Sequence, residues 1–292
     1  MNGDVRIGIS GWNYKGWRGV FYPKDLPHRR ELEFASRAFN SIEINGSFYS
    51  LQLPTSYQRW RRETPENFLF SVKAPRFISH MKKLRDVQAP LANFFASGVL
   101  ALEQKLGPIL WQFPPNFGWN PERFRDFFEL LPKRAAEAAE LGRLHNAKLK
   151  ARAFLRIQTD RPLRYCVEIR HPSFLVPEFF HLLREYNVAF VFADTAGKWP
   201  YSEDVTADFV YCRLHGDTQL YASGYSPGAL DWWAARLKLW RQGKQPADAK
   251  LISAAASAGA RDLFVYFDND AKVHAPFDAQ QLAERLAGHR AT

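Results

Sequence analysis

Residues 188–194 read Val-Ala-Phe-Val-Phe-Ala-Asp, a short apolar run that ends in a carboxylate. Seven similar runs recur along the chain, and nearly every one gives way to polar residues at its C-terminal end. They span residues 5–12, 41–45, 68–73, 109–113, 166–171, 209–215 and 263–268. Short apolar runs separated by helical patterns are typical of buried parallel strands. The sequence therefore predicts an α/β fold, a single (β/α)8 TIM-type barrel with a polar mouth at the C-terminal ends of its strands.

Composition favours one large globular domain over other classes of protein. The chain has 292 residues, of which 46% are hydrophobic, and a formal net charge of +10. No apolar run approaches the roughly 20 residues that a membrane-spanning helix needs, so no membrane partner is expected. The first predicted strand begins at Val5, which leaves no room for a secretory signal. The two cysteines provide no disulfide framework. We expect a cytoplasmic protein; the sequence does not indicate its oligomeric state.

The segments between the strands predict the order of helices. Residues 86–105 have apolar side chains at helical spacing and are expected to form one long helix before Gly107-Pro108. The connection at about 114–163 is the longest and is expected to hold two helices. No linker is evident, so residues 1–292 are interpreted as a single TIM-barrel domain. A doubly wound open sheet is the alternative, but eight repeats favour closure.

Alternation along each strand predicts which side chains point into the barrel. Apolar residues such as Ile42, Ile44, Phe70 and Val72 belong against the helices, which turns their neighbours inward. The predicted inward set includes many charged residues: Glu43, Lys73, Glu168, Arg170, Arg213, His215 and Asp268. A barrel interior is usually filled with Val, Ile and Leu, and burying charge is costly unless the charges pair or serve a ligand. A structural network of ion pairs is the plainer interpretation, and a functional site is the one we favour.

Several phrases of the sequence resemble those of a known family when taken together. They are Glu43-Ile44-Asn45-Gly46-Ser47-Phe48-Tyr49, Leu110-Trp111-Gln112-Phe113-Pro114-Pro115, Val167-Glu168-Ile169-Arg170-His171-Pro172-Ser173, Arg213-Leu214-His215-Gly216 and Tyr266-Phe267-Asp268-Asn269. The chain resembles the YecE-like family, also called domain of unknown function 72, nearly from end to end. The resemblance implies a TIM-type barrel in a bacterial cytosolic protein. It implies no particular reaction, so function must be argued from the site.

The leading hypothesis is an enzyme that acts on a small anionic or polyhydroxylated substrate. Glu43 and Glu168 would serve as general acid and base, because two carboxylates in unlike environments can take opposite protonation roles. Lys73, Arg170 and Arg213 would hold a phosphate or carboxylate. His215 would shuttle protons, and Asp194 ends its strand at the rim. The remaining predicted substrate-binding residues are Ser10, Trp12, Asn45, Phe48, Tyr49, Gln112, His171, Tyr266, Asp268 and Asn269.

Three alternatives for the chemistry stay open. In the first, Glu43, Glu168, Asp194, His215 and Asp268 bind a divalent metal in a hydrolase or isomerase, including a phosphodiesterase-like enzyme, although nearby Arg and Lys disfavour a cation. In the second, a glycosidase, the expected carboxylates are missing, because strands four and seven end in Gln112 and His215. In the third, a non-catalytic module binds nucleic acid or another ligand. No nucleotide-binding glycine motif is present, so no organic cofactor is predicted.

Three basic or phosphate-binding features of the sequence each have two interpretations. The stretch 143–164 is rich in Lys and Arg and contains one acidic residue, Asp160; it is either a solvated surface or a nucleic-acid contact. Trp60 among neighbouring arginines either stacks on bases or lies buried on an amphipathic helix. The loop 223–226 precedes a predicted helix, where it is either a phosphate site or an ordinary capped turn.

Overall fold

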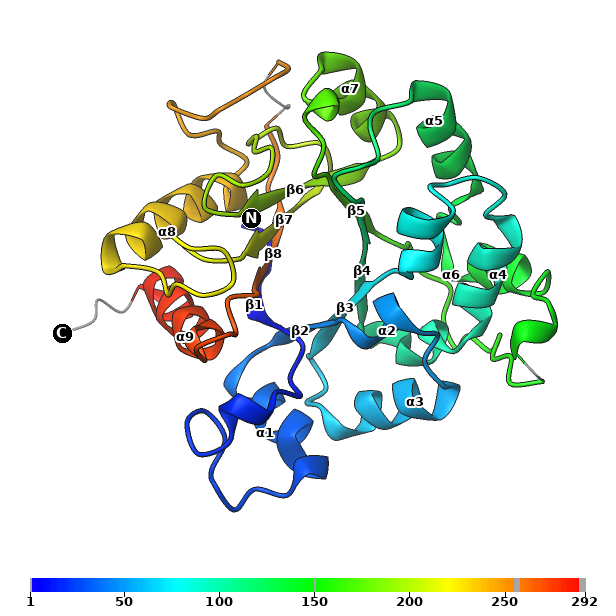
Figure 1. Ribbon diagram of the computed structural model, residues 1–292, viewed down its shortest axis with the longest axis horizontal. Helices are drawn as coiled ribbons and strands as arrows, with labels where there is room; N and C mark the ends of the chain where they lie inside the picture. The colour runs from blue at the N-terminus through cyan, green and yellow to red at the C-terminus, as the bar shows by residue number, and fades with distance from the viewer. Residues whose placement is uncertain (1, 150, 255–257, 289–292) are drawn as a thin grey trace. The chain divides into compact units, whose positions relative to one another are not determined.

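The computed structural model describes residues 2–149, 151–254 and 258–288. Its eight strands form a closed barrel in the order β1-β2-β3-β4-β5-β6-β7-β8, and every strand pair with a defined register is parallel (Figure 1). This confirms the predicted (β/α)8 fold. By its internal contacts the chain divides into two compact units. Unit 1 comprises Met1–Glu43 and Leu175–Thr292, and unit 2 comprises Ile44–Phe174.

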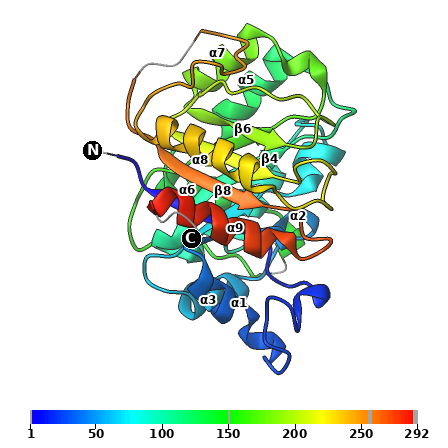
Figure 2. The same ribbon diagram turned by 90° about the vertical axis from the view of Figure 1, so that its left-hand side faces the viewer.

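Unit 1 contains strands from both ends of the chain. Its strands are β1 (Val5–Ser10), β2 (Ser41–Ile44, whose last residue belongs to unit 2), β6 (Val188–Asp194), β7 (Phe209–Leu214) and β8 (Asp262–Phe267). Its α-helices are α1 (Glu31–Ala38), α7 (Pro177–Glu185), α8 (Pro227–Arg241) and α9 (His274–Ala287). Helices α8 and α9 pack against each other and against β8 (Figure 2).

The run at residues 188–194 is buried in the way that its sequence predicts. Every residue from Val188 to Ala193 is buried. Phe190 packs on Phe180 of α7, with ring centroids 5.1 Å apart, and Phe192 packs on Trp240 of α8 at 4.8 Å. Both aromatic side chains therefore face the helices. Asp194 shares their parity, and its carboxylate also lies against α8, 3.3 Å from Nε1 of Trp233.

Unit 2 carries three strands and five α-helices among its described residues. The strands are β3 (Leu69–Lys73), β4 (Leu106–Gln112) and β5 (Tyr165–Glu168). The α-helices are α2 (Gly46–Tyr49), α3 (Pro54–Glu63), α4 (Gln88–Ala96), α5 (Pro121–Leu130) and α6 (Ala135–Gly142). A π-helix spans Phe77–Met81. The two helices expected in the connection after β4 are thus confirmed as α5 and α6.

The single helix expected over residues 86–105 is wrong. Helix α4 ends at Ala96, and Val99–Lys105 follows as a 3-10 helix with a kink at Glu103, whose φ is 53°. The break lies at Gly98, whose φ is 118°, and a Cβ atom there would stand 2.5 Å from the Cα of Pro54. Close approach of α3 therefore fixes a glycine with positive φ at a point where apolar spacing alone predicts continuous helix.

Candidate functional site

A cluster of polar side chains fills part of unit 1 at the ends of four strands. We call it the Arg213 cluster; its members are Ser10, Glu43, Tyr211, Arg213, His215 and Asp268. Parallel pairing aligns Ser10 with Glu43 between β1 and β2, and Arg213 with Tyr266 between β7 and β8. Because β1 also pairs with β8, the four strands are neighbours and their terminal side chains converge.

Glu43 is the most fully bonded carboxylate of this cluster. Arg213 approaches it with two nitrogens, Nη2 at 2.9 Å from Oε1 and Nε at 3.1 Å from Oε2. The Tyr211 hydroxyl donates to Oε2 at 2.6 Å, and the Ser10 hydroxyl donates to Oε1. The side chains of Glu43 and Arg213 are both fully buried. Two-point pairing with additional donors is the arrangement that compensates the desolvation of a buried ion pair. The geometry thus gives Glu43 an evident function in orienting Arg213.

His215 and Asp268 form the outer part of the same cluster. Nδ1 of His215 lies 3.0 Å from Oδ2 of Asp268, and Nη2 of Arg213 lies 3.0 Å from the same oxygen. The side chain of Asp268 is 16% exposed, whereas those of Arg213 and His215 are fully buried. Among these three residues, Asp268 is therefore the one that solvent or a ligand can contact.

Three other residues of unit 1 that the sequence singled out have internal partners. The Tyr266 hydroxyl lies 2.6 Å from Oγ of Ser41. Nδ2 of Asn269 donates to the backbone oxygen of Ser223 and to Oδ2 of Asp278. Asn269 thus links the loop before α8 to helix α9. The carbonyl of Trp12, a partly buried residue, accepts a hydrogen bond from the Tyr22 hydroxyl.

Asp194 joins the same loop to strand β6. Its Oδ2 accepts from the Tyr225 hydroxyl at 3.1 Å and from Trp233. Burial raises the pKa of Asp194 above that of an ordinary aspartate, while these hydrogen bonds partly offset the shift. These hydrogen bonds help to position α8. The catalytic role expected for Asp194 stays a prediction.

A second polar cluster lies in unit 2, where three consecutive strands end. Strand β3 ends at Lys73, β4 at Gln112 and β5 at Glu168, and the register pairs Gln112 with Glu168. Arg170 follows two residues after β5. We call Lys73, His80, Gln112, Glu168 and Arg170 the Glu168 cluster.

Cations outnumber carboxylates in the Glu168 cluster. Arg170 holds the buried Glu168 carboxylate with Nε at 3.1 Å and Nη2 at 3.0 Å from Oε1. Lys73 is 8% exposed, and its Nζ stands 4.3 Å from the ring centroid of Phe48. One carboxylate therefore accompanies two cations, both of them largely buried.

Burial and the nearby positive charges lower the pKa of His80. Burial lowers its pKa to about 4, and Lys73, Arg170 and Arg76 push the pKa in the same direction, whereas Glu168 opposes them. Its Nε2 lies 3.4 Å from Nε2 of Gln112, and its Nδ1 lies 2.9 Å from Oγ of Ser79. His80 is consequently a neutral imidazole at pH 7.

The remaining candidates in unit 2 are arranged around this cluster and its loops. Phe48 is buried and packs edge-on against His80, with ring centroids 5.1 Å apart. Tyr49 is 71% exposed. Asn45, the N-cap residue of α2, is partly buried. Nδ1 of His171 lies 2.8 Å from Oγ of Ser173, which favours a structural role for this histidine in its loop.

Sequence reasoning missed two residues whose protonation the fold perturbs. His80 lies in the π-helix, which no sequence pattern predicted; its place shortly after the polar end of β3 was the available signal. Asp270 follows Asp268 by two residues, and burial together with the charge of Asp268 raises its pKa to about 6. The spacing of these two aspartates was visible, but their burial was not.

Comparison with known proteins now identifies the family. The family model described as "Protein of unknown function DUF72" matches residues 6–292. The chain belongs to the DUF72 family. It is 29% identical over 123 residues to the UPF0759 protein YunF of Bacillus subtilis, covering 40% of this chain and 43% of YunF. It is 26% identical over 170 residues to the UPF0759 protein YecE of Escherichia coli K12, covering 58% of this chain and 50% of YecE. The chain thus spans about half the length of these relatives.

Two solved structures of DUF72 proteins have the same fold. A protein from Thermotoga maritima is 24% identical, with a TM-score of 0.72 over 97% of this chain and 99% of its own. A protein from Enterococcus faecalis is 16% identical, with a TM-score of 0.69 over 97% of this chain and 95% of its own. These similarities support the barrel and leave the chemistry to be argued from this DUF72 chain.

The candidate metal ligands in the described part of this DUF72 protein do not gather around a common point that suits a metal. Among the residues that the structure describes, no three His, Cys, Asp or Glu side chains form such a group. Glu43 and Asp268 both contact the Arg213 guanidinium, Glu168 contacts Arg170, and Asp194 contacts Tyr225 and Trp233. The residues therefore do not fit a divalent metal site as they stand.

The loop before α8 in the DUF72 chain is a capped turn. Oγ of Ser226 accepts from the backbone nitrogen of Ala229, and Oδ2 of Asp217 accepts from both the nitrogen and the hydroxyl of Ser226. A carboxylate thus already occupies the side of the helix N-terminus that an anion would approach, which favours the cap over a phosphate site.

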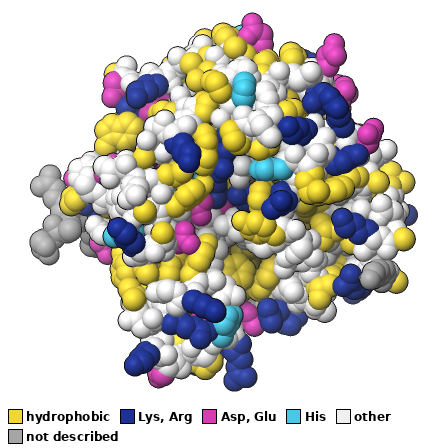
Figure 3. All heavy atoms as spheres, in the orientation of Figure 1, with side chains coloured by type: hydrophobic (Ala, Val, Ile, Leu, Met, Phe, Trp, Pro, Cys, Tyr) yellow, Lys and Arg dark blue, Asp and Glu magenta, His cyan; other side chains and the backbone are white. Residues whose placement is uncertain are grey.

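The basic features give little support to a nucleic-acid surface. Within 143–164, where Lys150 lies outside the described residues, Nη1 of Arg161 donates to the backbone oxygen of Leu106. Trp60 is buried, as its amphipathic interpretation predicted. On the face drawn in Figure 3, Lys and Arg side chains form separate groups among uncharged and apolar atoms. No described helix is long and apolar enough to cross a membrane.

Proposed function

We propose that this DUF72 protein is an enzyme whose substrate is a small organic anion, bound by the Glu168 cluster of unit 2. Lys73 and Arg170 hold a phosphate or carboxylate group, and the Gln112 amide provides a polar contact that fixes its orientation. Glu168 transfers the proton at the reacting atom. The proposal rests on the residues of unit 2.

The observation that carries the proposal is the gathering of two buried cations, an amide and a carboxylate at three successive strand ends. Both cations are largely buried beside Glu168, and a guanidinium and an ammonium group side by side at strand ends are suited to bind the oxygens of a phosphate or carboxylate. Burial is the main cause of the lowered pKa of His80, and Lys73 and Arg170 of this cluster lower it further. The C-terminal ends of parallel strands are also where barrel enzymes carry their chemistry.

Glu168 has the features of a proton-transfer group. Its carboxylate is buried and is contacted by Arg170 on one oxygen, Oε1. A bound anion would compete with Glu168 for the Arg170 guanidinium, which weakens the stabilisation of the ionised carboxylate and makes Glu168 a better proton acceptor. General acid–base catalysis of this kind typically contributes about 10²–10⁴-fold in rate.

A thermal-shift screen of phosphorylated and carboxylated metabolites tests this function. Ligands should raise the melting temperature of the wild-type protein, and Lys73→Gln should reduce that rise. Glu168→Gln removes the competing carboxylate, so it should keep or strengthen binding while turnover of the bound ligand falls by about 10²–10⁴-fold. Arg62→Gln, an exposed charge change elsewhere in unit 2, is the control.

Two results would contradict the proposal. Equal stabilisation of the wild-type and Lys73→Gln proteins would mean that the anion binds elsewhere. Unchanged turnover in the Glu168→Gln variant would remove Glu168 from the chemistry.

A further inference from the structure

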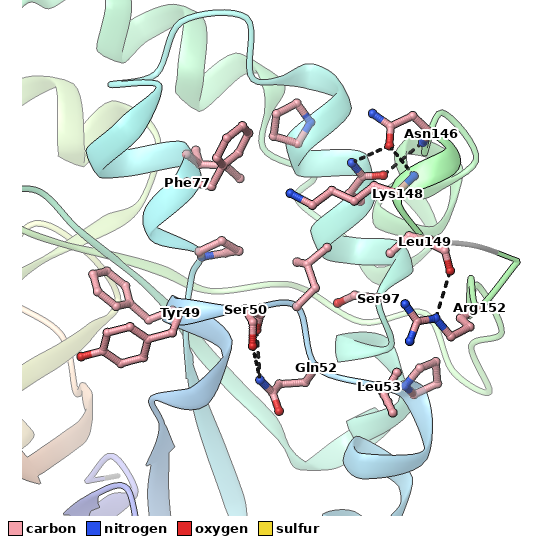
Figure 4. Close-up of a pocket in the computed structure, with 17 residues that line it drawn as sticks. Tyr49, Ser50, Gln52, Leu53, Phe77, Ser97, Asn146, Lys148, Leu149 and Arg152 are labelled. Carbon is pink, nitrogen blue, oxygen red and sulfur yellow. Dashed lines mark hydrogen bonds between the residues drawn. The ribbon is translucent and has the colours of Figure 1, made fainter.

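Unit 2 contains a pocket outside the Glu168 cluster. It lies between the segment 48–54, the start of the π-helix, helix α4 and the side chains of Asn146, Lys148, Leu149 and Arg152 (Figure 4). Its volume of about 420 Å³ is within the range of about 300–1,000 Å³ that is usual for small-molecule sites. The pocket is therefore large enough for an organic ligand.

Three large apolar side chains at the rim of the pocket are exposed to solvent. Tyr49, Leu53 and Phe77 are exposed by 71%, 42% and 36%, and all three line the pocket. Single exposed apolar residues are common, but several around one concavity indicate a surface that is covered when a ligand binds. A ligand with an apolar body would remove these side chains from water.

The charges of the lining have one sign. Lys148 and Arg152 line the pocket, and none of the described residues that line it is Asp or Glu. Figure 4 shows Lys148 extending toward Phe77, and its Nζ stands 4.7 Å from the Phe77 ring centroid. An ammonium group held over an aromatic ring next to apolar walls favours an anionic end on the ligand.

Asn146, two residues before Lys148, is fixed to helix α4. Asn93 is buried; its Nδ2 donates to Oδ1 of Asn146 at 3.2 Å, and its Oδ1 accepts from the backbone nitrogen of Asn146 at 3.1 Å. Oδ1 of Asn146 also accepts from the backbone nitrogen of Lys148. The two amide side chains therefore hold the backbone from which Lys148 projects, which lowers the entropy lost when a ligand binds.

We propose that this pocket binds a small organic carboxylate with an apolar body, which lies against Tyr49, Leu53 and Phe77 while its carboxylate pairs with Lys148 and Arg152. Phe48 lines the pocket and also contacts Lys73, so the pocket and the Glu168 cluster share one wall. The proposal does not depend on catalysis by Glu168.

Competition with a fluorescent probe tests the pocket. Anilinonaphthalene sulfonate, an apolar anion, should bind the full-length protein with an increase in fluorescence, and decanoate should displace it at lower concentrations than decan-1-ol. The double substitution Lys148→Gln, Arg152→Gln should weaken decanoate binding by about fivefold or more, because two ion pairs of modest strength are lost. Leu53→Glu puts a negative charge at an exposed position of the rim and should weaken it similarly.

Controls separate this site from the proposed catalytic cluster. Arg62→Gln removes a positive charge from unit 2 outside the pocket and should leave decanoate binding unchanged. Glu168→Gln should also leave it unchanged, so the pocket and the proposed function stand or fall separately. Circular dichroism spectra and melting temperatures verify that each variant is folded.

Three results would overturn the pocket proposal. Equal competition by decanoate and decan-1-ol would show an apolar groove without selectivity for anions. Wild-type affinity in both the double variant and Leu53→Glu would place the probe elsewhere. Binding to phosphatidylglycerol vesicles without any competition by decanoate would favour a lipid surface over a free carboxylate.

Discussion

His80 combines burial with a strongly positive environment, and this determines its protonation state. Its pKa of about 4 makes the side chain neutral over the physiological range. A histidine whose pKa is lower in the folded than in the unfolded state stabilises the fold less as the pH falls. Here the loss begins near pH 6.5 and is complete below about pH 4.

Titration of His80 followed by NMR should give a pKa near 4, with His80→Phe identifying its resonances. Lys73→Gln should raise this pKa, because Lys73 is among the charges that lower it. An anion bound to the Glu168 cluster should raise it as well, since a negative charge favours the imidazolium form. A value near 6.5 in the free protein would contradict the buried, cationic environment.

The pKa of Asp270 is shifted upward, in the opposite direction to that of His80. Its pKa is raised to about 6 by burial and by the charge of Asp268, so the ionised form is less favourable in the folded chain than in the unfolded chain. Stability is therefore lost as the pH rises from about 4 to 6.

Asp270→Asn should stabilise the protein at pH 7 by about 1 kcal/mol, a value reduced because the side chain is partly exposed to solvent. At pH 3.5 the aspartate is largely protonated in both states, and the substitution should have a much smaller effect. Urea unfolding of both proteins at the two pH values measures the difference. An equal effect at both values would show that the pKa of Asp270 is not the cause.

Among the structural elements, four strands of unit 1 are joined through one buried guanidinium. Arg213 of β7 contacts Ser10 at the end of β1 and Glu43 of β2, and it also reaches Asp268, which follows β8. These contacts supplement the backbone pairing of the strands. Removing one partner of a buried ion pair costs more than the pair contributes, because the other charge is left uncompensated.

Glu43→Gln should lower the free energy of unfolding by about 3 kcal/mol. This is the lower end of the usual cost of removing one partner of a buried ion pair, because Asp268 still contacts Arg213. Tyr211→Phe, which removes a single hydrogen bond to the carboxylate, should cost about 2 kcal/mol. The double variant Glu43→Leu, Arg213→Met should recover part of the loss. Urea unfolding gives all three values. A Glu43→Gln loss smaller than that of Tyr211→Phe would contradict the assigned role.

The break between α4 and the 3-10 helix depends on one glycine. Gly98→Ala should destabilise the protein by about 2 kcal/mol or more, because φ is strongly positive and the new Cβ meets the backbone of Pro54. Gly16→Ala is the matched control, since no atom lies within 4 Å of the Cβ position there. Comparable unfolding free energies for the two variants would argue against the close approach of α3.

For the molecule as a whole, the pairing of carboxylates with arginines leaves them poorly placed to bind a metal ion. We expect protein purified without chelators or an affinity tag to contain no stoichiometric transition metal by elemental analysis. EDTA should leave its melting temperature unchanged, because the candidate ligands contact Arg213, Arg170 or α8. A stoichiometric metal, or a fall in melting temperature on chelation, would favour the metal-dependent alternative.

The sequence by itself determined the closed barrel and the family of this protein. Eight apolar runs with polar ends are a local pattern, and local patterns follow directly from the alternation of side chains along a strand. The same alternation placed Glu43 and Arg213 on inward faces, where the structure pairs them. The buried state of Trp60 also followed from its helical spacing.

Only the tertiary structure decided which charged side chains meet. The sequence pattern predicts a reacting group at Glu43, yet its oxygens accept from Ser10, Tyr211 and Arg213, all of them far from Glu43 in the sequence. The break at Gly98, the π-helix that carries His80 and the pocket beside α4 likewise depend on contacts between distant segments. A sequence pattern records which face a residue occupies; the partners on that face are set by the packing of elements, which no local pattern contains.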